Sequence, residues 1–586
     1  MYAKEQIRNA CNRAINNILF EGTTDVEIFN TFFEISFLED ENTKKNIVDS
    51  ITQDILNKKL ELTRIKHHGK VLVPKNNLAA FRICSLTDIY DEIFYLTLVL
   101  LMSNEIEAKR LNRSEKKIYS YRFNKNKSSK ILFDENFNFT SFKEEVRKES
   151  IKKGNNIIVE CDIANFYDRL NLHRLESTLL SIKAIDRDAI KLLNELLLYW
   201  SHRDSYGIPV GSNASRILAE ASLIEVDNYL KRKKVKFYRF VDDYRIFAKD
   251  SNEAFRSLTI LIERLQLEGL FVNSSKTKIK QIVINEATET VATTIETNEA
   301  VEKNKTFEIE AIARTSEVVA ATVERNESDT ITEENSVGIN TIKNHITDRS
   351  SLSKVIRGYS GVIPLKFRKI SEKEVEKLSL LDFDKEFDLI KDEVIIEPEK
   401  IKNLIKIVVA QEKWEEITKI LLLIKKFPQF TPYIIDILTK YEEHLSHISI
   451  KEIKEDFKNI ILDEDTPEYI IIYLVKLFSN GAFTDKEILL DFFFNLKRNS
   501  GDYIGRAVLD ALSNCKNLSR GDALQIKTYF QRADIFEKRR ILYILNKHLE
   551  LEERNAYFKN VGMIEKDHFI LHMTDRKKDF MYPKKN

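Results

Sequence analysis

The segment Phe237–Lys249, FYRFVDDYRIFAK, places two adjacent acids, Asp242 and Asp243, between apolar residues that favour strands. This pattern predicts a β-hairpin with both carboxylates at its tip. Adjacent carboxylates repel each other unless cations neutralise them, so one interpretation is a divalent-metal site. The other is an ordinary solvated turn, where Asp-Asp pairs also occur. A third carboxylate placed upstream would decide in favour of the metal site.

Asp162 is that third carboxylate. It follows the apolar run Ile157–Val159, which predicts a strand that delivers the acid into a cleft, about 80 residues before the Asp-Asp pair. Mg²⁺ prefers carboxylate oxygens and keeps several waters, so two or three Asp residues suffice to bind it. Nucleotidyl transfer needs two such ions, one at the attacking hydroxyl and one at the triphosphate. The three acids therefore predict a polymerase-like metal site.

Between the acids lies Gly207–Leu230, GIPVGSNASRILAEASLIEVDNYL. Two glycines flank a proline, and an Asn-Ala-Ser start leads into a segment with helical apolar spacing. A loop bracketed by glycines lets the backbone approach a base pair closely. A plain helix–loop–strand unit is the alternative interpretation.

In order along the chain, these segments resemble the motifs of the reverse transcriptase family. DIANFYD is similar to its motif A, GIPVGSNAS to motif B, FVDD to motif C and GLFVNSSKTKI to motif D. Val71–Tyr95 resembles the first fingers motif, and KIYSYRF (Lys117–Phe123) the second. The resemblance covers roughly residues 60–280 and implies a fingers-and-palm fold with nucleotidyltransferase activity.

The resemblance also implies roles for single residues. Lys75 and Arg82 would bind the triphosphate, and the Ile163 carbonyl would join Asp162, Asp242 and Asp243 as a metal ligand. Tyr167 would lie under the sugar and reject a ribose 2′-hydroxyl, which favours dNTPs; the alternative is a core aromatic. Lys276 would protonate the departing pyrophosphate, or would be a phosphate-binding or solvated lysine. The residues expected to shape the base-pair pocket are Gly207, Pro209, Gly211 and Ser212.

Two segments combine basic and aromatic residues. Lys109–Lys130 is interpreted as a nucleic-acid-contacting finger, because Lys and Arg bind phosphates while aromatic rings stack on bases. Lys231–Arg239 leads into the acid hairpin and is equally consistent with a solvated approach to a strand. The net charge of the whole chain is only +1, so any basic surface must be local.

The length of 586 residues indicates more than one domain. We expect a helical N-terminal segment at 1–60, fingers and palm at 61–280, an acidic Thr/Glu-rich insertion at 281–350 and a helical domain at 351–586. Within the insertion, apolar and polar residues alternate as they do in strands, which favours β structure over disorder. The four cysteines have no metal or disulfide spacing, no signal peptide opens the chain and the apolar runs are too short to span a bilayer. These features predict a cytoplasmic protein.

The C-terminal region has an aromatic period. Tyr433, Tyr469, Tyr503 and Phe536 are spaced by roughly 33–36 residues, which is typical of stacked helix pairs. We therefore expect an α-helical, HEAT-like repeat domain in which these rings form the core between repeats. The expected fold class is α+β, with reverse transcriptase-like fingers and palm before this all-α domain.

A palm followed by helical repeats is similar to the bacterial abortive-infection and defence-associated reverse transcriptases. That resemblance implies antiphage defence, dNTPs as substrates, Mg²⁺ (or Mn²⁺) as cofactor, and oligomeric assembly. It also implies DNA synthesis that is untemplated or that uses a bound non-coding RNA, in some relatives primed by a protein hydroxyl. Tyr582 in the basic tail is one candidate primer. The alternatives are an RNA polymerase, an RNA-templated retroelement polymerase and a non-catalytic RNA- or DNA-binding scaffold.

Overall fold

The computed structural model describes most of the chain. The described residues are 2–24, 32–66, 69–74, 81–126, 129–202, 204–282, 372–392, 398–421, 423, 430–440, 442–479, 481–495 and 503–575. Lys75, Tyr582 and nearly all of the insertion predicted at 281–350 lie outside them.

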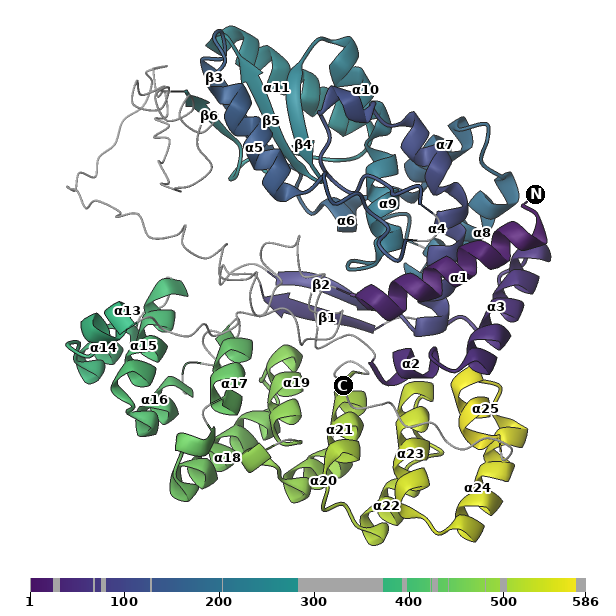
Figure 1. Cartoon of the computed structure of the whole chain (residues 1–586), viewed down its shortest axis with the longest axis vertical. Helices are drawn as coiled ribbons and strands as arrows, with labels where there is room; N and C mark the ends of the chain where they lie inside the picture. The colour runs from purple at the N-terminus through teal and green to yellow at the C-terminus, as the bar shows by residue number, and fades with distance from the viewer. Residues whose placement is uncertain are drawn as a thin grey trace.

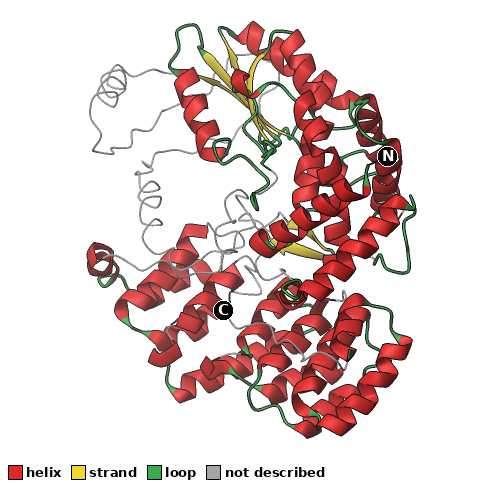
Figure 2. Cartoon of the chain, turned by 45° about the vertical axis from the view of Figure 1, so that its right-hand side comes forward, coloured by secondary structure: helices red, strands yellow, loops and turns green. Residues whose placement is uncertain are grey.

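A four-stranded antiparallel sheet forms the centre of the palm region. It consists of β3 (Ile157–Asp162), β4 (Lys236–Phe240), β5 (Asp243–Ala248) and β6 (Lys278–Gln281), in the order β4-β5-β3-β6. The two-residue connection between β4 and β5 confirms the hairpin predicted from the sequence. Figure 2 shows this sheet among mostly helical elements, with a second, two-stranded sheet apart from it.

The alternation of side chains along the strands gives the sheet two buried faces. Val159, Cys161 and Tyr244 join the main core, on the side where α11 (Ser251–Leu267) packs against β3 and β5. Ile158 and Phe247 belong to a smaller aromatic cluster on the opposite side. The helix α5 (Phe139–Ser150) covers that side and contacts β4. Both faces are thus fixed by packing, and with them the register of the strands.

Helices surround the sheet and extend the main hydrophobic core. They are α6 (Phe166–Arg169), α7 (Leu172–Ser181), α8 (Arg187–Trp200), α9 (Asn213–Ser222) and α10 (Ile224–Arg232). α9 has every side chain buried, including the polar and charged side chains of Asn213, Arg216 and Glu220. It packs between α4 and α7 and contacts α10.

The N-terminal part is mainly helical and carries one hairpin. Its elements are α1 (Lys4–Glu21), α2 (Phe32–Phe37), α3 (Glu41–Leu56), β1 (Gly69–Pro74), β2 (Phe81–Leu86), α4 (Ile89–Lys109) and the short η2 (Arg113–Glu115). α4 is buried almost throughout and contacts α1, α8 and α9. It therefore joins the N-terminal helices to the palm region.

The described residues after 371 are helical, as the sequence predicts. They form α13 (Glu372–Leu378), α14 (Phe383–Lys391), α15 (Pro398–Gln411), η5 (Trp414–Glu416), α16 (Ile417–Leu421), α17 (Thr431–Lys440), η7 (Glu442–His444), α18 (His447–Leu462), α19 (Glu468–Leu477), η8 (Gly481–Phe483), α20 (Lys486–Asn495), α21 (Tyr503–Asn514), α22 (Arg520–Lys527), α23 (Ile535–His548), α24 (Leu551–Ile564) and α25 (His568–Thr574).

Alternate helices of this part stack on one another. α17 contacts α19, α19 contacts α21, α21 contacts α23 and α23 contacts α25. The periodic aromatics Tyr433, Tyr469, Tyr503 and Phe536 lie at the starts of α17, α19, α21 and α23, and all four are buried. In the first view the helices follow an arc from α13 to α25, with β1 and β2 between the arc and α1 (Figure 1). Within the described residues, no helix combines the length and apolar character needed to cross a membrane.

Candidate active site

The three predicted acids come together at one end of the central strands. Asp162 at the end of β3 and Asp243 at the start of β5 are register partners in the antiparallel ladder. Asp242 occupies the turn just before β5, and its carbonyl accepts a hydrogen bond from the Ile163 backbone N–H at 3.1 Å. The side chain of Ile163 is buried. The sheet register therefore brings acids that are 80 residues apart in sequence to the same edge.

The turn that presents these acids is strained and supported from behind. Val241 has a φ of 55°, in the left-handed region that β-branched residues rarely adopt. Its carbonyl accepts a hydrogen bond of 2.8 Å from Nη1 of Arg239, a fully buried side chain. Such strain persists only where the surroundings over-determine the conformation, and it gathers at functional sites.

The acids repel one another. Burial raises the pKa of Asp242 to about 7, with the negative charges of Asp162 and Asp243 adding to the effect, while the charge of Arg82 opposes it. Burial also raises the pKa of Asp243, and Arg245 works against that rise. Arg82 on β2 thus lies near enough to act electrostatically on the acids.

Two cationic side chains neutralise part of the negative charge of these acids. Lys276 Nζ lies 3.1 Å from Asp162 Oδ2. Arg245 forms an ion pair with Asp243 and reaches Glu160 at 3.8 Å. Glu160, which also binds Lys280 at 2.9 Å, is a fourth acid on the same face of the sheet. No motif in the sequence singled it out.

The carboxylate oxygens of Asp162, Asp242 and Asp243 are of the type that binds a divalent cation. Hard cations such as Mg²⁺ bind carboxylate oxygens, and a bound cation would offset both the burial and the neighbouring negative charges that raise the pKa of Asp242. In the described part of the chain, however, no three His, Cys, Asp or Glu side chains are arranged so that they could hold a metal ion together. Lys276 and Arg245 occupy carboxylate oxygens that a metal would need.

A cavity of about 250 Å³ adjoins the acids on the same face of the sheet. Its walls include Phe142 and Arg147 of α5, Ile158 and Glu160 of β3, and Arg245 of β5. Arg245 therefore links the cavity to Asp243.

Tyr167 and the glycine loop lie side by side. The backbone N–H of Ile208 donates to the Tyr167 carbonyl at 3.1 Å, and that of Gly207 donates to the Leu170 carbonyl at 2.9 Å. Tyr167 itself is buried, with 9% of its surface exposed. Its ring packs edge-on against Phe166 at a centroid distance of 5.5 Å. The two segments predicted to recognise the nucleotide are therefore neighbours.

The rest of the loop is fixed by specific contacts. At Gly211 φ is +113°, and a Cβ there would approach Thr24 Oγ1 to 2.7 Å, so glycine is required. Ser212 caps α9 by accepting from the Ala214 backbone N–H, and its hydroxyl donates to the buried Glu92. Pro209 lies between these two points, in the same loop.

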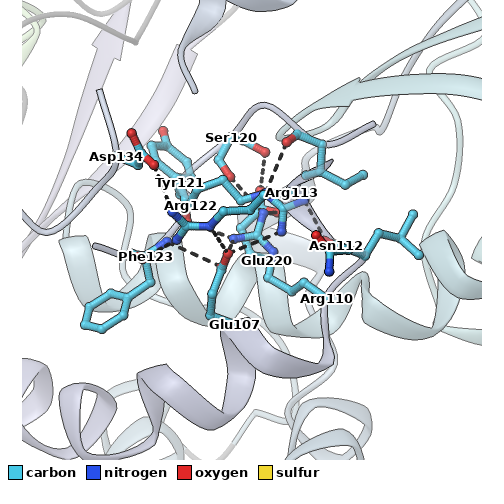
Figure 3. A network of polar contacts seen from close by, with 12 residues as sticks. Glu107, Arg110, Asn112, Arg113, Ser120, Tyr121, Arg122, Phe123, Asp134 and Glu220 are labelled. Carbon is cyan, nitrogen blue, oxygen red and sulfur yellow. Dashed lines mark hydrogen bonds and ion pairs between the residues drawn. The ribbon is translucent and has the colours of Figure 1, made fainter. Parts of the chain in front are cut away.

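The predicted nucleic-acid finger Lys109–Lys130 is partly wrong. Arg110 and Arg122 are buried, and both bind Glu107 of α4 (Figure 3). Arg113 also binds Glu107, at 3.0 Å. These arginines are therefore structural, because acids from other elements neutralise them, while the exposed lysines of the segment stay available for phosphates.

The same network extends to the acid hairpin. Glu220 of α9 binds Arg110 and, at 2.9 Å, Arg239. Asp227 of α10 binds Arg239 at 2.6 Å. Arg239, the residue that holds the strained Val241 carbonyl, is thus fixed by two buried acids. The sequence showed Arg239 only as the end of a basic run, since its partners lie on other elements.

An acid pair on a β-hairpin, a third acid on the adjacent strand and a glycine loop leading into a buried helix form the arrangement that the motifs predict for a polymerase palm. Residues 74–308 match the family model "Reverse transcriptase (RNA-dependent DNA polymerase)". The chain therefore carries a domain of reverse transcriptase type in this range. Domains of this family in general transfer nucleotides in DNA synthesis, with dNTPs and nucleic acid as substrates. Domains of this family generally use divalent metals.

The likeness of this chain to a solved structure is weak. A solved structure of apo telomerase from Candida tropicalis, truncated from its C-terminal domain, is 16% identical and aligns over 38% of this chain and 51% of that one, with a TM-score of 0.28. The match thus spans about half of the telomerase chain, and a TM-score this low does not establish a common overall fold. A search among curated proteins gives no match.

Proposed function

We propose that this protein is a DNA polymerase of the reverse transcriptase type that uses Asp162, Asp242 and Asp243 to hold two Mg²⁺ ions. The observation that carries the proposal is the pairing of Asp162 with Asp243 across β3 and β5, with Asp242 in the adjoining turn. When bound, the metals would lower the pKa of the primer hydroxyl and take up charge on the triphosphate. Mn²⁺ would substitute for Mg²⁺, and the Ile163 carbonyl is an additional candidate ligand.

The other site residues orient the substrate. Arg82, with Lys75, neutralises the triphosphate, consistent with the effect of the Arg82 charge on Asp242. Tyr167 lies beside the Gly207–Ser212 loop and excludes a ribose 2′-hydroxyl by its bulk. Lys276 holds a proton near Asp162 that it can give to the departing pyrophosphate.

The setting of this activity is antiphage defence. Its support is the resemblance to defence-associated reverse transcriptases in which helical repeats follow the palm, together with the stacking of α17 to α25. We assign these helices to a HEAT-like domain, and the synthesis to an untemplated reaction or to one that copies a bound non-coding RNA. Oligomeric assembly and priming by a protein hydroxyl belong to the same proposal.

Incorporation of labelled nucleotides tests the function. The purified chain is given dNTPs or NTPs with Mg²⁺ or Mn²⁺, with and without a primed RNA template, and the products are sequenced after protease treatment. We expect incorporation of dNTPs and little of NTPs. Preference for NTPs would indicate an RNA polymerase, and binding of nucleic acid without any incorporation would indicate a scaffold.

A further inference from the structure

The hairpin β1–β2, which carries Arg82, is anchored at both ends in one cluster of buried charges. Lys66 precedes β1, and its Nζ lies 2.7 Å from Asp88, the residue that follows β2 and begins α4. The same Nζ lies 3.3 Å from Asp567, at the start of α25. The two ends of the hairpin therefore meet at the C-terminal helices.

Arg539 of α23 lies at the centre of this cluster and is fully buried. Its Nη1 and Nη2 donate to the two oxygens of Asp88 at 2.9 and 3.0 Å. Its Nε and Nη2 also donate to the two oxygens of Asp567 at 3.0 and 2.6 Å. Two bidentate pairs on one planar guanidinium fix orientation as well as distance, which a lysine could not do.

The charge balance of the cluster supports a permanent contact. Burial by itself would raise the pKa of Asp88, but Arg539 and Lys66 lower that pKa well below its ordinary value. Asp88 therefore stays ionised, and removal of Arg539 would leave a buried carboxylate with Lys66 as its remaining cation.

The helical part also contacts the length of the hairpin. α19 packs against β1, and the residues Val71, Val73 and Cys84 on the covered face are buried. Beside the cluster, the ring of His568 stacks on Tyr90 of α4 at 5.1 Å. Arg82 shares the covered face of the hairpin with Val73, its register partner.

We propose that Arg539 is a positioning residue for nucleotidyl transfer: it anchors the hairpin through Asp88 and so sets the place of Arg82 relative to the acids. The proposal rests on the proposed function, because Arg82 acts on the triphosphate of a dNTP. The C-terminal helices would then be part of the polymerase and not a separate module.

The first test compares Arg539→Lys, which keeps the charge, with Arg520→Lys. Arg520 forms an exposed ion pair with Glu553 at 2.9 Å in the same helical part, so it is a matched control. In Arg539→Lys we expect the KM for dNTP to rise about tenfold, with kcat and the KM for the primed template changed less than about threefold. Arg520→Lys should leave all three unchanged.

Coupling to Arg82 separates positioning from a general structural role. If Arg539 acts through the hairpin, Arg82→Gln should raise the KM for dNTP less in the Arg539→Lys background than in the wild type. The proposal would be overturned if the rise in KM for dNTP in the double variant equalled the product of the rises in the two single variants. An unchanged KM for dNTP in Arg539→Lys would also overturn it.

Hydrogen exchange gives a readout that needs no activity. Amides of 69–74 and 81–86 should exchange faster in Arg539→Lys and in Arg539→Gln, while those of β3 and all amides of Arg520→Lys stay as in the wild type. Unchanged exchange in the hairpin would overturn the anchoring. A wild-type chain without incorporation would defeat the proposed function instead, and the exchange result would still decide whether Arg539 holds the hairpin.

Discussion

Two groups of charged side chains lie next to each other in the palm and differ in how their charges are balanced. Around Glu220, buried acids and buried arginines pair within the network. Arg239 and Arg110 lower the Glu220 pKa in spite of burial, whereas burial raises the pKa of Asp227 although Arg239 opposes that rise. At the hairpin tip, burial together with the negative charges of Asp162 and Asp243 raises the pKa of Asp242 to about 7. Glu220, which contacts two buried arginines, and Asp242, which lies near two other acids, thus shift in opposite directions.

The difference indicates separate roles. A network whose charges are paired inside the protein needs no ligand, and it holds the Val241 turn in place through Arg239. A buried carboxylate such as Asp242, held near two like charges, costs stability and is maintained where function requires it. The first group is therefore structural and the second is the candidate catalytic centre, although Arg239 lies only three residues before Asp242.

Replacement of the acids should have the largest effect on activity. Asp242→Asn or Asp243→Asn should lower dNTP incorporation by about a thousandfold or more, because each removes a proposed metal ligand. Circular dichroism and thermal melting should show an intact fold. Glu225→Gln, an exposed acid on α10, is the control and should incorporate at the wild-type rate. Wild-type activity in either Asp variant would remove these acids from the mechanism.

Disruption of the buried network should act on stability. Arg239→Gln leaves Glu220 and Asp227 without their shared partner and should lower the free energy of unfolding by about 3–5 kcal/mol. Urea denaturation measures this change. The exposed Arg232→Gln on the neighbouring α10 should change it by less than about 0.5 kcal/mol. Equal effects of the two variants would contradict the structural role of the network.

The pH dependence of stability should reveal the repulsion among the acids. The folded pKa of Asp242, about 7, lies above its ordinary value of 3.8, so between these values the folded state binds more protons than the unfolded state. Stability without metal should therefore fall as the pH rises from about 4 to 7 and then level off. The loss is of the order of 1–2 kcal/mol, allowing for partial exposure.

Asp242→Asn should lack this contribution and gain stability relative to the wild type as the pH rises. The comparison is made by urea denaturation at several pH values in the presence of a chelator. The buried Glu92, with a pKa raised to about 7, contributes equally to both proteins and cancels in the difference. Parallel curves for the two proteins would show that Asp242 carries no such penalty.

The sequence predicted the parts that depend on local pattern. The apolar run before Asp162 predicted one strand, and the apolar residues on both sides of Asp242 and Asp243 predicted a hairpin of two more; these are β3, β4 and β5. The aromatic period indicated which rings of the C-terminal helices are buried. These inferences succeed because each rests on residues close together in the chain.

The parts that depend on distant partners could not be predicted. Arg110 and Arg122 were predicted to contact phosphates. The acid Glu220, which binds Arg110, lies on a helix 110 residues further along the chain, so the local sequence did not reveal that Arg110 is already paired. Arg539 belongs to no pattern that the sequence shows, since its partner Asp88 is 451 residues away. A basic run shows its own charge in the sequence but not the acids that neutralise it.

The most direct test of the difference between the two charged groups is a thermal-shift titration with Mg²⁺ at pH 8. The wild type should be stabilised as Mg²⁺ is added, by an amount that grows with the logarithm of its concentration above the Kd. The triple variant of Asp162, Asp242 and Asp243 to Asn should start from a higher melting temperature and show no shift. An equal Mg²⁺ shift in both proteins would contradict the assignment of these acids as the metal-binding centre.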